Sequence, residues 1–201
     1  MLTQAVPLKL SFKGNRDYIT GADIAQEMLS HLGACSQVRI EFHQIASRAL
    51  CMYEVSADQL PDLKQNDNVY AWLTCMDASG LQRYWLACAQ AQAVQLKRLD
   101  YDESFFTRFS VLDESGIYAD ENSLKSRPID ALVALNKLML NQYVEVHPWV
   151  FVRLDLHHWP LEVSHVFLKC PAKASLGLYK TQILCGDAIV GAVYFTRRPM
   201  S

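Results

Sequence analysis

The chain has 201 residues, of which 51% are hydrophobic and 20% are charged, and its formal net charge is -2. A chain of this length is long enough to bury a core without disulfides or metal ions, as one large domain or two small ones. Lysine and arginine are spread along the sequence, so the charge pattern indicates neither a nucleic-acid-binding protein nor a protein held on an anionic membrane.

The first residues, Met1 to Pro7, lack a basic stretch followed by an apolar core. No apolar run approaches the ~20 residues of a membrane span, so we expect a cytoplasmic protein without a membrane partner. The six cysteines do not occur in C-x-x-C pairs, and most lie in apolar, strand-like runs. This distribution favours buried, reduced thiols over disulfides or metal ligands.

The first half of the chain predicts a strand, a helix and then a run of antiparallel strands. A strand over residues 6–12 is followed by a polar turn over 13–18. Apolar residues at helical spacing, among them Ile24 and Met28, predict a helix over 21–32 that ends before Gly33. The strands expected after this helix cover residues 38–46, 49–55, 69–76 and 81–91.

The second half repeats this order after a charged, loop-like connector over residues 100–127. A helix is expected to begin at Pro128, because proline is favoured in a first helical turn, and its apolar stripe includes Leu132 and Leu135. The strands expected after this helix cover residues 149–159, 161–170, 176–184 and 188–197.

A short sequence repeat supports the same division. Residues 38–44 (VRIEFHQ) are matched 114 positions later by residues 152–158 (VRLDLHH). In both copies apolar and polar residues alternate, as in a strand with one buried face. The repeat and the element order together predict two copies of one unit, residues 1–99 and 128–201, joined by the connector.

One helix against a strongly curved antiparallel sheet, present twice in one chain, resembles the hot-dog fold. The resemblance covers most of the chain and implies an α+β protein with two tandem hot-dog units. Such a chain is a pseudo-dimer that either suffices as a monomer or assembles into a homo-oligomer. In dehydratases of this superfamily a His-x-x-Pro-Gly-x-Pro-like segment precedes the helix; here residues 15–21 (NRDYITG) contain no histidine and no proline.

The resemblance implies an acyl thioester as ligand, carried on coenzyme A or on acyl carrier protein, and no cofactor. It places catalytic residues near the start of a helix, where free N–H groups polarise a thioester carbonyl and stabilise an oxyanion. The candidate catalytic residues there are Asp17, Asp23 and Glu27. Asp23 fits a purely structural role at the helix start equally well, and Glu27 fits a solvated position.

The candidate substrate-binding residues are Asn15, Arg16, Arg197 and Arg198. The first two adjoin the helix start, and the two terminal arginines are candidates for binding a phosphate of the carrier or are simply solvated. No metal site is expected, because the adjacent His157 and His158 point to opposite faces of their strand.

The leading prediction is therefore a protein that handles an acyl thioester, with hydrolysis as one activity. In that reaction Glu27 or Asp23 would activate water or attack the carbonyl carbon. Two alternatives stay open: a non-catalytic ligand-binding or scaffold protein, and a dehydratase-like enzyme with an atypical acid/base pair.

Overall fold

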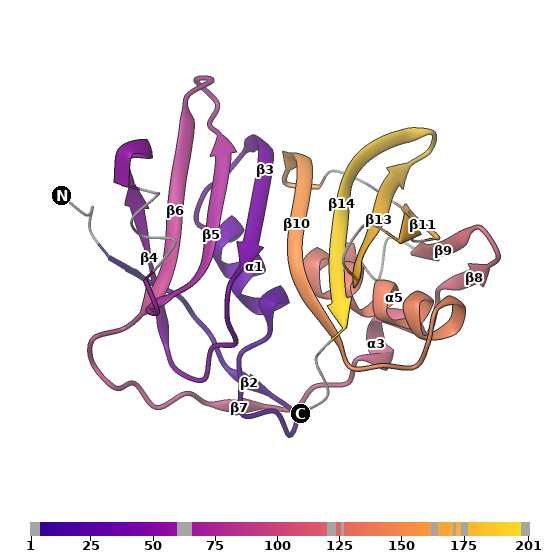
Figure 1. The fold of residues 1–201 in the computed structure, drawn as a ribbon, viewed down its shortest axis with the longest axis horizontal. Helices are drawn as coiled ribbons and strands as arrows, with labels where there is room; N and C mark the ends of the chain where they lie inside the picture. Colours follow the sequence, from indigo (N-terminus) through magenta and orange to yellow (C-terminus); the bar gives the residue numbers. More distant parts are fainter. Residues whose placement is uncertain are drawn as a thin grey trace. The chain divides into compact units, whose positions relative to one another are not determined.

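The computed structural model describes residues 5–59, 66–119, 124–125, 127–161, 165–170, 172–173 and 177–197. The chain divides into two compact units. Unit 1 consists of Met1–Tyr101 with His158–Pro160, and unit 2 consists of Asp102–His157 with Leu161–Ser201. In each unit an antiparallel sheet is combined with one principal helix, which confirms the predicted α+β class (Figure 1).

The described strands of unit 1 form a sheet in the order β1-β4-β6-β5-β3. Two further strands, β2 and β7, pair in parallel as a separate ribbon. The elements are β1 (Val6–Pro7), β2 (Phe12–Lys13), α1 (Gly21–Ser30), β3 (Cys35–Phe42), β4 (Leu50–Val55), η1 (Ala57–Gln59), β5 (Val69–Met76), β6 (Gln82–Ala89) and β7 (Arg98–Leu99).

Helix α1 forms because its start is capped and one side of it is apolar. The Thr20 hydroxyl oxygen accepts a hydrogen bond from the backbone N–H of Asp23, with 3.2 Å between the two atoms. Ile24, Met28 and Leu29 are buried at helical spacing. The helix ends at Ser30, two residues earlier than predicted.

The described strands of unit 2 have the order β10-β14-β13-β11-β9-β8, and β12 pairs with β13. Helix α5 contacts β9, β11 and β14. The elements are α3 (Ser104–Thr107), β8 (Val111–Asp113), β9 (Gly116–Ala119), α5 (Pro128–Tyr143), β10 (Trp149–Trp159), β11 (Val166–Lys169), β12 (Ala172–Lys173), β13 (Leu178–Cys185) and β14 (Ala188–Arg197).

The two copies of the sequence repeat lie on β3 and β10. In β3 the apolar Val38 and Ile40 are buried, and Arg39 between them is exposed. In β10 the pairing with β14 shifts between Phe151 and Arg153, so that Val152 is the extra residue of a bulge and is only half-buried. The alternation that the repeat predicts is therefore clear from Val38 to Ile40 in β3 and is interrupted at Val152 in β10.

The described part of the stretch expected to be a loop-like connector includes the elements α3, β8 and β9 of unit 2. Strand β9 pairs with β11, and its residues Ile117 and Ala119 are buried. The acidic Asp113 serves the turn that joins β8 to β9, because its Oδ1 accepts from the backbone N–H of Ser115 over 2.8 Å. Part of the acidic composition that suggested a loop thus belongs to a tight hairpin turn.

Candidate functional site

Asp23 lies buried in the first turn of α1 and is held from two sides. The Lys13 Nζ of β2 is 2.8 Å from Asp23 Oδ1, and the Thr20 hydroxyl donates to Asp23 Oδ2 over 2.6 Å. Only 4% of the Lys13 side chain and 7% of the Asp23 side chain are exposed. The Lys13 Nζ also lies over the ring of Tyr101, 4.3 Å from its centroid. The carboxylate predicted as a catalytic group is therefore part of a buried ion pair that joins β2 to the start of α1.

The other candidate carboxylates of unit 1 lie closer to the surface. Glu27 is half-buried on α1, and its Oε2 accepts from the backbone N–H of Lys9 over 3.1 Å. Its Oε1 has no hydrogen-bond partner among the residues that the structure describes. Asp17 is exposed in the turn before α1, as is Asn15. Of these side chains, Glu27 best combines partial burial with an available oxygen.

The turn before α1 is held by a cation that no sequence motif indicated. Arg98 of β7 donates from Nη1 to the backbone oxygens of Gly14, over 2.6 Å, and of Arg16, over 2.7 Å. The Arg16 guanidinium lies over the Tyr101 ring, 5.3 Å from its centroid. Arg16 therefore belongs to the same cluster as the Lys13–Asp23 ion pair.

The two terminal arginines are the other candidates for binding a phosphate. Arg197 belongs to unit 2, where its Nη2 lies 3.0 Å from Glu145 Oε2 and donates to the Tyr179 hydroxyl over 3.3 Å. Arg198 lies outside the described residues. The role of either residue in binding a phosphate stays a prediction.

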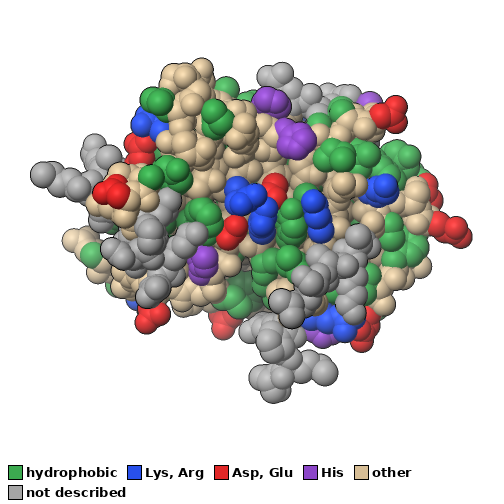
Figure 2. Space-filling view, turned by 45° about the horizontal axis from the view of Figure 1, so that its top comes forward, with side chains coloured by type: hydrophobic (Ala, Val, Ile, Leu, Met, Phe, Trp, Pro, Cys, Tyr) green, Lys and Arg blue, Asp and Glu red, His purple; other side chains and the backbone are tan. Residues whose placement is uncertain are grey.

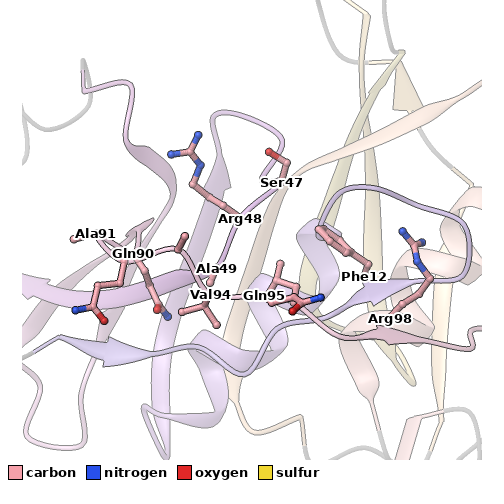
Figure 3. Close-up of a pocket in the computed structure, with 12 residues that line it drawn as sticks. Phe12, Ser47, Arg48, Ala49, Gln90, Ala91, Val94, Gln95 and Arg98 are labelled. Atoms are coloured by element: carbon pink, nitrogen blue, oxygen red, sulfur yellow. The ribbon is translucent and has the colours of Figure 1, made fainter.

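A groove of about 570 Å³ opens on unit 1 (Figure 3). It is formed by residues 47–49 between β3 and β4, by residues 90–96 after β6, and by Phe12 and Arg98 of the β2–β7 ribbon. Its volume is in the range of small-molecule sites. Phe12 precedes Lys13 in the chain, so β2 links the groove to the ion pair at the start of α1.

The described residues give three further findings on charge, metal binding and membrane spans. Figure 2 shows that several of the described basic side chains lie close to acidic ones. Within the described ranges, no group of three or more His, Cys, Asp or Glu side chains is placed to hold a metal ion. Of the helices that the structure describes, none has the length and apolar character needed to cross a bilayer.

Comparisons with known proteins give similarities to solved structures. No protein-family model and no curated protein matches the sequence. The chain is similar to the tesB protein of Mycobacterium avium subs paratuberculosis, with 11% identity, coverage of 90% of this chain and 88% of that chain, and a TM-score of 0.46. It is also similar to the dehydratase domain of PpsC from Mycobacterium tuberculosis in complex with C12:1-CoA, with 12% identity, coverage of 90% and 85%, and a TM-score of 0.42. A third similar structure is the erythromycin dehydratase, with 12% identity, coverage of 96% and 84%, and a TM-score of 0.43.

All six cysteines carry free thiols, and four of them lie on neighbouring strands of unit 1. Cys51 of β4 pairs in register with Cys88 of β6. Burial and, to a lesser extent, the neighbouring Cys51 together raise the pKa of Cys88 to about 11. A hydrogen bond with Cys75 lowers the pKa of Cys35 and raises that of Cys75. Cys88 is therefore a protonated, weakly nucleophilic thiol at neutral pH.

We expect iodoacetamide at pH 8 to alkylate Cys88 about 100-fold more slowly in the folded protein than in the urea-unfolded chain, because so little thiolate is present. Peptide mass spectrometry after timed quenching measures both rates. Between pH 9 and 11 the unfolded chain releases the Cys88 proton while the folded chain keeps it, so this thiol lowers the free energy of unfolding as the pH rises through that range. Equal alkylation rates in the two states would contradict the burial of Cys88.

Proposed function

We propose that this chain binds acyl thioesters carried on coenzyme A or on acyl carrier protein. The observation that carries the proposal is the groove of unit 1, which has the volume of a ligand site and adjoins the ribbon that leads to the start of α1. The tandem hot-dog architecture supports the same class of ligand, because members of that superfamily mostly act on acyl thioesters.

Hydrolysis of the bound thioester is the second candidate, and the position of Glu27 favours it. A general base or nucleophile needs a carboxylate oxygen that can reach water or substrate. Both oxygens of Asp23 are engaged, one by Lys13 and one by Thr20, whereas Glu27 uses one oxygen for the Lys9 N–H. Glu27 is therefore the carboxylate that we assign to catalysis if turnover occurs, and Asp23 is the one that we assign to structure.

Calorimetric titration with acyl-CoAs of short, medium and long chains tests the binding proposal, and release of free thiol from the same compounds tests hydrolysis. We expect saturable binding by the parent protein. Any turnover should fall at least 100-fold in Glu27→Gln, the range that general acid–base catalysis typically contributes. Glu114→Gln, at an exposed glutamate of unit 2, is the matched control and should leave turnover unchanged.

The outcomes separate the two candidates. Binding without turnover supports a ligand-binding protein and removes hydrolysis. Turnover that survives in Glu27→Gln shows that a different group carries the reaction. If neither acyl-CoAs nor an acylated carrier protein binds or is hydrolysed, the proposed function is wrong.

A further inference from the structure

The groove of unit 1 is positively charged although the chain as a whole is slightly acidic. Its ionic lining residues are Arg48 and Arg98, and the described residues that line it include no aspartate or glutamate. Arg48 is exposed and forms no ion pair with any residue that the structure describes. A guanidinium without a carboxylate partner can offer parallel N–H groups to a phosphate. The groove therefore favours an anionic ligand.

The second cation of the groove is fixed in place before any ligand arrives. The hydrogen bonds from Arg98 Nη1 to the backbone oxygens of Gly14 and Arg16 hold the guanidinium beside the Phe12 ring, with 5.6 Å from Cζ to the ring centroid. In Figure 3, Phe12 and Arg98 lie toward one end of the groove and Gln90 toward the other. A charge that is already ordered costs little conformational entropy on binding.

Glutamine amides and small apolar side chains make up much of the remaining surface of the groove. Gln92 and Gln95 are exposed, and each side-chain amide can both donate and accept hydrogen bonds. Gln90 is held by donation from Nε2 to the Leu50 backbone oxygen over 3.0 Å. Ala49 and Ala93 leave room for a ligand to approach the backbone closely. Such a lining suits a thin, flexible chain that carries amide groups as well as an anion.

We infer that this groove binds the phosphopantetheine arm of the thioester, with Arg48 at the phosphate and the exposed glutamines at the amides. The inference rests on the proposed function and adds to it which part of the ligand the groove holds. A phosphopantetheine arm combines a phosphate with amides along a narrow chain, which matches the arginines, the glutamines and the small side chains of the groove. Coenzyme A and a carrier protein both present this arm.

Calorimetric titration with free phosphopantetheine and with pantetheine, which lacks the phosphate, tests the inference. The parent protein should bind phosphopantetheine about tenfold more tightly than pantetheine. Pantetheine has no phosphate and therefore lacks one charge-assisted contact. Arg48→Gln should weaken phosphopantetheine binding by the same factor and leave pantetheine binding unchanged. Arg83→Gln removes an exposed arginine of unit 1 that pairs with Glu54 and Asp77, so it should change neither affinity.

Further measurements separate the sources of the arm and the ways in which the inference can fail. Coenzyme A compared with a carrier protein, with and without its phosphopantetheine, shows which carrier supplies the arm. If acyl-CoA binds equally well to the parent protein and to Arg48→Gln, the groove assignment is wrong while the proposed function stands. If inorganic phosphate competes for the groove as effectively as phosphopantetheine does, the groove is a simple anion site and the inference is wrong. If no compound binds the parent protein, both proposals fail.

Discussion

Replacing Lys13 with methionine should lower the free energy of unfolding by about 3–5 kcal/mol, because the buried Asp23 carboxylate then loses its cation. Methionine keeps much of the apolar length of lysine, so the decrease in the free energy of unfolding comes from the lost charge rather than from altered packing. Asp23 would keep the Thr20 hydroxyl as a donor, but that bond is already present in the parent protein, and one hydrogen bond to a charged group contributes only about 1.5–3 kcal/mol. Urea unfolding followed by tryptophan fluorescence measures the change.

Two further variants separate the ion pair from the individual side chains. Lys13→Met combined with Asp23→Asn removes both charges and should recover most of the loss, because the cost lies in the uncompensated charge. Arg83→Met breaks ion pairs whose arginine is exposed to solvent, and it should cost less than about 1 kcal/mol. A loss below 1 kcal/mol in Lys13→Met would mean that Asp23 is hydrated or protonated, and Asp23 would return as a catalytic candidate.

This stability result bears directly on how activity measurements are interpreted. Substitution of Asp23 can abolish turnover simply because the start of α1 and the β2–β7 ribbon come apart. Substitution of Glu27 removes one hydrogen bond to the Lys9 N–H near the surface and should leave the fold intact. Loss of activity in the Glu27 variant is therefore evidence about chemistry, whereas loss in an Asp23 variant requires a check of the folded state.

The sequence predicts α1 well because local signals determine it. Ile24 and Met28 recur at helical spacing and are buried, and Asp23 lies in the first turn as expected. Lys13, the partner of Asp23, could not be predicted, since ten residues and a turn separate the two in the chain. The groove was also missed, because three segments far apart in sequence form it and none carries a motif.

The strands within residues 100–127 were not predicted for a different reason. Strands β8 and β9 have 3 and 4 residues, too few for alternation to stand out from the charged residues around them. What makes them strands is pairing, since β9 lies antiparallel to β11 from Gly116 to Ala119. Such pairing partners are set by tertiary structure and leave little signal in a short segment.

Replacing Gly116 with alanine should lower the stability of unit 2 by about 3 kcal/mol. A Cβ at this position would overlap the backbone oxygen of Leu168 and lie 2.6 Å from Cζ of Phe167. Both atoms belong to β11, so β9 can relieve the overlap only by moving away from its pairing partner. Calorimetric unfolding measures the loss, and faster hydrogen exchange of the amides of β9 and β11 would locate it.

Gly186→Ala in the turn between β13 and β14 is the matched control, because its added Cβ meets no atom within 4 Å. Its backbone φ of +58° is unfavourable for alanine, which should cost about 1–2 kcal/mol. Both changes reduce the freedom of the unfolded chain in the same way, so a larger loss in Gly116→Ala reports the overlap with β11 beyond the cost of a positive φ. Equal losses, without local exchange at β9, would show that residues 116–119 do not pair with β11 and that the stretch is a connector after all.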